Sequence, residues 1–309
     1  MISYLVAIAT SAGFYVLLAL ALNLQWGITG LVNFGVAGLY AIGAYASALA
    51  TERLGLPVAL ALPLAGCIGA VVALGLAGLS ARLSGDYLAI VTLGFAEVVR
   101  LIAMNEDWLT RGPRGMGIAT QPLPAGMSRE AYALAYLGLV LAAVLVAYWA
   151  LERIRRAPFG RVLRAIREDP LVPATLGRNV QGFRLRAFAI GGALMAASGS
   201  LYAHWVLSIS PDHFQTPVTI VTWMAVVIGG AGNNRGLVLG AFLVVSVLEG
   251  TRFLGGLLPW LDAERLSALR IVLIGLLLIA AIRLRPQGLL PERSIHAADL
   301  AASQQGDKT

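Results

Sequence analysis

The chain has 309 residues, of which 58% are hydrophobic and only 13% are charged, and its mean hydropathy is +0.79. Because about a quarter of the residues in soluble domains are charged, this composition excludes a soluble globular protein and predicts an all-α, polytopic transmembrane bundle. We expect the net charge of +7 to set membrane topology rather than to bind nucleic acid, because the arginines concentrate in a few short stretches.

Long apolar runs predict the first four membrane spans. About 20 apolar residues cross a hydrocarbon core, and residues 1–51 carry no charged side chain, which is enough for two spans. The polar residues Asn23, Gln25, Thr29 and Asn33, with three nearby glycines, predict where these two spans divide. The four predicted spans are 4–24, 35–49, 56–79 and 87–104.

A polar loop rich in glycine and proline, 105–130, separates these spans from the remaining ones. We expect five more spans, at 131–151, 187–207, 218–230, 237–254 and 268–282. The predicted total is therefore about nine. Eight or ten are the alternatives, because the glycine-interrupted segments 56–83 and 218–240 can be re-entrant or broken.

The segment 153–186 differs from the rest of the chain because it contains nine arginines and only two acidic residues, Glu168 and Asp169. A basic loop between two spans belongs in the cytoplasm. With spans alternating in direction on either side of it, this placement predicts an external N-terminus and an internal C-terminus.

Within this basic segment, the apolar residues Val162, Ile166 and Leu171 recur at roughly helical spacing. Asp169–Pro170 and Gly177 are turn signals, so we expect two short helices joined by a turn. Such a piece cannot bury its apolar stripe alone, and we expect it on the lipid headgroups or in a groove of a partner protein. The residues alone leave open a solvated anchor loop and a docking element.

The few charges within the predicted spans come in two pairs, Glu97 with Arg100 and Glu249 with Arg252. A spacing of three places each pair on one helix face. Each pair is expected either to form an ion pair at the membrane interface or to contribute to an external vestibule or to the docking of a delivery protein. Only Glu97 comes near the mid-span carboxylate that a proton-coupled carrier needs. This pattern argues against secondary transport without excluding it.

Uncharged polar side chains inside spans suit a pathway through which a solute passes without being held tightly. Hydrogen bonds between helices, or packing in the case of the tyrosine, are the alternative explanation for each residue. The candidate residues of a translocation pathway, together with the carboxylate described above, are Asn23, Asn33, Tyr45, Thr92, Glu97 and Thr222.

One histidine, His204, follows a serine, Ser200, at one helical turn. A serine hydrolase also needs preorganised donors for an oxyanion and a cleft, and no motif marks either of them. We therefore expect no enzymatic activity, and we interpret His204, which precedes Trp205, as an interfacial side chain.

Five stretches, in matching order over nearly the whole chain, resemble one transporter family. They are LNLQWGITGLVNFGVAGLYAIGAY (22–45), GDYLAIVTLGFAEVVRL (85–101), LTRGPRGM (109–116), the stretch 160–203 that begins GRVLRAIREDP, and RPQGLL (285–290). They are similar to the permease subunits of branched-chain amino acid ABC importers, most of all to the LivM-type member of the LivH/LivM pair. The resemblance implies a permease domain over 1–294, and we expect 295–309 to be a disordered tail.

The resemblance also implies function, partners and location. The expected function is ATP-driven import of leucine, isoleucine or valine across the bacterial inner membrane. The expected partners are a second, LivH-type permease, two cytoplasmic ATPase subunits that hold the ATP and Mg²⁺, an external solute-binding protein and the lipid membrane. The only lysine is Lys308, so the chain cannot form a P-loop, and we expect no cofactor or metal on it. Urea, amides or other amino acids are alternative solutes, and an ion-coupled secondary transporter is the alternative class.

The resemblance further implies that 153–186 holds the coupling helices that dock on the ATPases. The residues that match the family's docking loop are Gly160, Arg164, Ala165, Ile166, Arg167, Glu168, Asp169 and Gly177. Between the turn signals this loop departs from the family at Pro173, where alanine is usual, and we expect the proline to shorten or kink the second helix.

Overall fold

The fold is known from a computed structural model. The structure describes residues 2–79, 83, 85–124 and 126–257, and closer to the C-terminus 269, 272–273, 275–277, 279–280, 283–285 and 287–292. The predicted span 268–282 is therefore described only in part. The predicted tail 295–309 lies outside the described residues.

The described chain is nearly all helical, which confirms the all-α part of the predicted fold class. Its long helices are α1 (Ile2–Leu22), α2 (Val36–Glu52), α3 (Val58–Leu79), α4 (Gly85–Asn105), α6 (Arg129–Arg156), α9 (Val180–Val206), α10 (Thr216–Gly229) and α11 (Asn234–Leu257). The short helical pieces are η1 (Asn23–Ile28), α5 (Asp107–Thr110), η2 (Gly112–Arg114), α7 (Pro158–Glu168), α8 (Leu171–Thr175) and η3 (Pro211–Phe214). Two short strands, β1 (Met116–Gly117) and β2 (Ser208–Ile209), pair antiparallel.

By length and composition, four of the described helices can cross a membrane: Ser3–Ile28, Val58–Leu79, Gly85–Asn105 and Arg129–Arg156. They correspond to the predicted first, third, fourth and fifth spans, and the total of about nine stays a prediction. The segment 56–83 is a continuous helix over Val58–Leu79. By contrast, 218–240 is broken by a turn between α10 and α11.

Helix α10 is short for a membrane span. Its 14 residues rise about 21 Å at 1.5 Å per residue, whereas a hydrocarbon core is about 30 Å thick. The chain reaches it through the 3₁₀ turn η3 and leaves it through Gly230, which has a φ of +104°. Such interrupted helices occur in transporters where the freed backbone groups find partners inside the protein.

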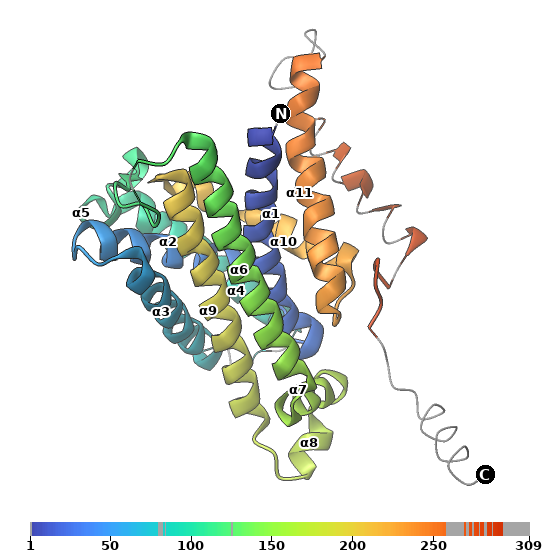
Figure 1. Ribbon diagram of the computed structural model, residues 1–309. Coiled ribbons are helices and arrows are strands. Elements are labelled where there is room, and N and C mark those ends of the chain that lie inside the picture. The colour runs from blue at the N-terminus through green and yellow to red at the C-terminus, as the bar shows by residue number, and fades with distance from the viewer. Residues whose placement is uncertain are drawn as a thin grey trace.

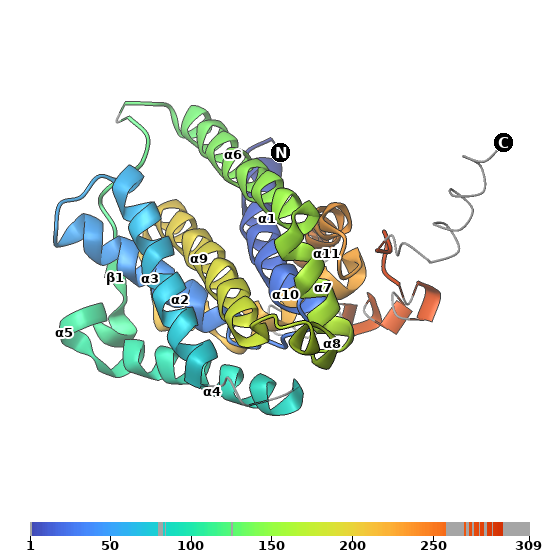
Figure 2. The ribbon, with the colours of Figure 1, turned by 90° about the horizontal axis from the view of Figure 1, so that it is seen from below.

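Helix α9 packs most extensively against α2 and α3, and α1 lies next to α6, α9 and α11 (Figures 1 and 2). Small residues permit this close approach. A Cβ on Gly43 of α2 would lie 1.9 Å from the carbonyl oxygen of Ala196 in α9, and a Cβ on Gly199 would lie 2.0 Å from that of Tyr40. Packing of small residues is a principal source of helix association in lipid.

The polar loop 105–130 is anchored at one end of the bundle. Strand β1 pairs with β2 beyond the end of α9, and the Glu52 carboxylate accepts hydrogen bonds from the backbone N–H groups of Ala119 and Thr120 at 2.9 and 3.1 Å. Arg53 donates to the carbonyl oxygens of Trp108 and Leu109. Helices α7 and α8 lie at the opposite end of the bundle (Figure 1).

The close contact of α2 with α9 gives a stability prediction. Gly43→Ala is expected to destabilise the protein by about 1–3 kcal/mol, because the added methyl group meets backbone that cannot move without shifting a helix. The measurement is thermal unfolding of the detergent-solubilised protein. Gly75→Ala in α3 is the matched control, since a Cβ there meets nothing within 4 Å, and equal melting temperatures for the two variants would contradict the prediction.

Candidate translocation and coupling sites

The first helix changes from α-helical to π-helical hydrogen bonding before it ends. After Leu22 it continues as the π-helix η1, and residues 30–35 are then extended or irregular until α2 begins at Val36. A Cβ on Gly27 would lie 2.0 Å from Asn23 Oδ1 and 2.8 Å from the backbone nitrogen of Gly232, so glycine is needed there. The predicted break in the helix is confirmed between α1 and α2, and the polar residues around it are buried.

Asn33 and Gln25 bridge this break to two other helices. Asn33 Nδ2 donates to Gln25 Oε1 at 2.7 Å, and Gln25 Nε2 donates to the carbonyl oxygen of Phe188 in α9 at 3.0 Å. Asn33 Oδ1 accepts from the N–H of Gly35 at 2.7 Å, and Trp223 Nε1 of α10 donates to the Asn33 carbonyl at 3.0 Å. These bonds satisfy polar groups of the break that lie away from water.

Asn23 connects the same break to the turn before α11. Its Nδ2 donates to Asn234 Oδ1 at 2.9 Å, and its Oδ1 accepts from the N–H of Gly232 at 2.8 Å. Asn234 Nδ2 in turn donates to Glu152 Oε2 at 3.1 Å, and Glu152 forms an ion pair with Arg155 at 2.6 Å. A line of polar contacts therefore runs from η1 to the end of α6, two residues before α7 begins.

The two threonine candidates differ in what they connect. Thr92 of α4 is buried, and its Oγ1 accepts from the N–H of Phe34 at 2.9 Å while donating to the Leu88 carbonyl at 2.8 Å. Thr222 of α10 is also buried, but its hydroxyl donates only to Val218 of its own helix, at 2.8 Å. The structure thus brings Asn33 and Thr92 together around the break and leaves Thr222 outside this network.

The remaining pathway candidates lie elsewhere. The ring of Tyr45 in α2 is buried, 5.7 Å from the ring of Phe214, and its hydroxyl has no hydrogen-bond partner among the described residues. Glu97 forms the predicted ion pair with Arg100 at 2.6 Å on α4, and its side chain is 46% exposed. The matching side chain at position 252 lies outside the described residues.

A cavity of about 490 Å³ lies between α1, α2, α9, α10 and α11. Its polar and aromatic lining includes Tyr15, Tyr40, Tyr202, Trp205, His213 and Glu249. Sequence reasoning missed this cavity because its walls come from five helices that are far apart in the chain. It is large enough for a small amino acid, and its walls are mostly apolar or aromatic.

His204 is not an interfacial side chain, which corrects the sequence interpretation. It is fully buried, its Nε2 is 2.9 Å from Ser47 Oγ, and its Nδ1 is 3.1 Å from the Thr120 carbonyl oxygen. The Ser200 hydroxyl donates to Ser47 at 2.8 Å rather than to the histidine. This arrangement ties α2, α9 and the 105–130 loop together, because each polar atom in it faces another polar group.

The basic segment folds as the predicted pair of short helices, α7 and α8, joined at Asp169–Pro170 and followed by Gly177 with a φ of +72°. One expectation about it was wrong. The apolar residues Leu163 and Ile166 of α7 are only 0% and 2% exposed. They pack within the chain, because α7 lies against α6, α9 and η1, rather than on lipid or a partner.

The exposed apolar surface of this segment lies on α8 instead. Leu171, Val172 and Leu176 are 70%, 53% and 75% exposed. Pro173 is buried on the other side, and α8 has only five residues, as expected for a helix that contains the proline. The Asp169 carboxylate accepts from the N–H of Leu171, the first residue of α8, at 2.8 Å.

The other docking candidates divide between inner and outer positions. Gly160 packs against the end of α6, where a Cβ would lie 2.5 Å from the carbonyl oxygens of Ile154 and Arg155. Glu168 is exposed, as is Asp169, while Arg164, Ala165 and Arg167 are half-buried. Arg167 turns inward and forms an ion pair with Glu292 at 2.8 Å.

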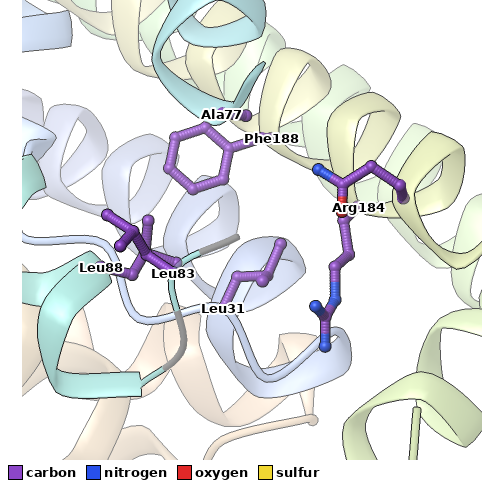
Figure 3. A pocket seen from close by; sticks show the side chains of 7 residues that line it. Leu31, Ala77, Leu83, Leu88, Arg184 and Phe188 are labelled. Atoms are coloured by element: carbon purple, nitrogen blue, oxygen red, sulfur yellow. The ribbon is translucent and has the colours of Figure 1, made fainter. Parts of the chain in front are cut away.

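A second, much smaller cavity lies where the α3–α4 connection meets α9 (Figure 3). Leu31, Leu88 and Phe188 line it, and the Arg184 side chain extends past it. Its volume of about 20 Å³ has room for roughly one water molecule, so it offers no solute site. Burial lowers the pKa of Arg184, and the guanidinium nevertheless stays charged at physiological pH.

The contrast between Asn33 and Thr222 gives a second prediction. Asn33→Ala is expected to lower the unfolding free energy by about 1–3 kcal/mol, because it leaves the Gly35 N–H and the side-chain oxygen Oε1 of Gln25 without these partners. Thr222→Val should change stability little, since it removes only a bond within one helix turn. Thermal unfolding in detergent measures both, and a variant at 222 as damaging as the one at 33 would refute the assigned roles.

Comparison with known proteins agrees with this architecture. Residues 4–282 match the family described as branched-chain amino acid transport system / permease component. The chain is 35% identical to the high-affinity branched-chain amino acid transport system permease protein LivM of Escherichia coli, over 93% of this chain and 70% of the relative. It is 34% identical to LivM of Salmonella typhimurium with the same coverage.

The chain is also 27% identical to the permease protein LivH of Salmonella typhimurium, over 76% of this chain and 80% of that relative. No solved structure matches it. The family match spans nearly the whole described chain, including η1, the polar network around Asn33 and the α7–α8 segment. The chain therefore belongs to the branched-chain amino acid transport permease family and is a LivM-type membrane protein.

Proposed function

We propose that this chain is a permease subunit of an ABC importer that moves leucine, isoleucine or valine across the bacterial inner membrane. The similarity to LivM proteins over 93% of the chain carries the proposal, and their names give the solute class. Urea, amides or other amino acids are the alternative solutes for the same type of importer.

The proposed partners follow from the missing P-loop lysine and from the similarity to LivH. ATP hydrolysis is assigned to two cytoplasmic ATPase subunits, which bind the ATP and Mg²⁺, because this chain has no lysine for a P-loop. The similarity to LivH supports pairing with a second, LivH-type permease. An external solute-binding protein supplies selectivity, so the permease needs only a weak site.

The α7–α8 segment is the proposed docking element for an ATPase. Its exposed apolar residues Leu171, Val172 and Leu176 follow directly after α7, on which Arg161 is exposed and Arg164 half-buried, and such a combination of apolar and basic groups suits a groove on a partner protein. The turn at Asp169–Pro170 fixes the angle between the two helices. Because α7 is packed against α6, α9 and η1, a displacement of α8 by a partner protein is transmitted through α7 to these elements.

The proposed solute path uses weak interactions only. The aromatic cavity between α1 and α11 has apolar walls that suit a branched side chain. Uncharged polar residues such as Asn33 and Thr92 lie at the break between η1 and α2. A path without a strong site releases its solute readily. Movement between outward-open and inward-open forms is then driven by ATP binding to the partner subunits.

The direct test of this function is reconstitution. The chain with its second permease and both ATPases, in proteoliposomes with the liganded binding protein, is expected to take up radiolabelled leucine only when ATP is supplied on the ATPase side. Without the ATPases, uptake should fall to the level of empty vesicles. Uptake that persists without ATPases and collapses with the proton gradient would instead identify a secondary transporter.

The docking surface gives a separate prediction. Leu171→Asp is expected to reduce copurification of the ATPase subunits by about tenfold, because it places a charge in the apolar part of the interface. Trp108→Ala is the matched control, since Trp108 is equally exposed at 70% but lies in α5, remote from α8 (Figure 1). The measurement is the ratio of ATPase to permease after affinity purification, and an unchanged ratio for Leu171→Asp would remove α8 from the interface.

A further inference from the structure

Arg167 points into the protein although it belongs to the docking element. Its Nη2 donates to Glu292 Oε2 at 2.8 Å, its Nη1 donates to the carbonyl oxygen of Gly27, and its side chain is only 28% exposed. Arg161 and Glu168 on the same helix are exposed. A planar guanidinium can donate hydrogen bonds to two acceptors in fixed directions at once. Arg167 therefore connects α7 to two separate segments of the chain.

The first of these segments is the π-helix η1. Gly27 lies within it, and the aliphatic part of Arg167 lies against Gly30, where a Cβ would come within 3.1 Å of Arg167 Cγ. A single π-helical turn is a local departure from α-helical geometry, and such turns are frequent at functional sites. Gly30, with a φ of +77°, is also a position that a side chain would strain.

The second segment is the chain around Glu292, which is itself fixed to the end of α10. The N–H groups of Leu289 and Leu290 donate to the carbonyl oxygens of Ile228 and Gly229 at 2.8 and 3.2 Å. A Cβ on Gly232 would lie 2.5 Å from Glu292 Oε2, so the carboxylate also lies against the turn before α11. Through Glu292, Arg167 is therefore connected to the second interrupted helix of the fold.

We propose that Arg167 is the coupling residue that transmits movement of the α7–α8 docking element to both helix breaks, η1 and the α10–α11 turn. The inference rests on the proposed function, because it assumes that an ATPase moves α7. Displacement of Gly27 shifts η1, and with it Gln25 and the Asn33 network that contacts α9 and α10. Exchange between π-helical and α-helical hydrogen bonding in η1 supplies the two-state element that such coupling requires.

The test separates coupling from docking in the complete reconstituted importer. Arg167→Ala is expected to retain the copurified ATPases and their ATP hydrolysis, but to lower leucine uptake about tenfold, within the range for a coupling free energy between two sites. Arg167→Lys should give an intermediate loss, because an ammonium group cannot hold both acceptors in the same geometry. Arg129→Ala is the matched control: Arg129 is exposed at the opposite end of α6 and lies outside the segment 153–186, so uptake should be unchanged.

Hydrogen exchange of the backbone amides of residues 23–35 provides a readout that a merely structural role would not move. Addition of ATP and the liganded binding protein should change exchange in this stretch in the unmodified importer and leave it unchanged in the Arg167→Ala importer. Wild-type uptake by Arg167→Ala, or a loss of uptake that only follows a loss of ATPase subunits, would overturn the inference. Failure of the unmodified chain to copurify with any ATPase would instead refute the proposed function.

Discussion

The need to satisfy buried backbone polar groups governs this structure. Between Ile28 and Val36 the chain has no regular helix, and backbone groups buried away from water need hydrogen-bond partners within the protein. Side chains from other helices supply such partners: Thr92 accepts from the N–H of Phe34, and Thr219 accepts from the N–H of Ala37 in the first turn of α2 at 3.1 Å. Together with the Asn33 network, these threonines of α4 and α10 connect the break to both helices.

Close packing makes this arrangement of partners possible. Because Gly43 and Gly199 bring α2 and α9 into backbone contact, the polar residues of both helices lie within reach of one another. The buried contact of Ser47 with His204 arises in this way. Close packing by small residues therefore determines which buried polar side chains of the two helices form hydrogen bonds.

The sequence predicted the local features well. Polar and glycine-rich composition located the break at 23–35, turn signals located α7, α8 and the bend between them, and a spacing of three identified the Glu97–Arg100 pair. The long-range contacts between these features could not be predicted from the sequence. Arg167 and Glu292 are 125 positions apart, and no periodicity relates them. The burial of Leu163 and Ile166 was missed for the same reason, because it depends on helices that pack against α7 from distant parts of the chain.

The hydrogen bonds at the C-terminal end of α10 also have a consequence for the order in which the protein folds during synthesis. The last carbonyl groups of a helix have no partner within it, and here those of Ile228 and Gly229 are satisfied by the N–H groups of Leu289 and Leu290. These donors leave the ribosome only after α11 and the chain that follows it. During synthesis, these carbonyl groups of α10 can therefore receive their partners only after nearly the whole polypeptide has been made.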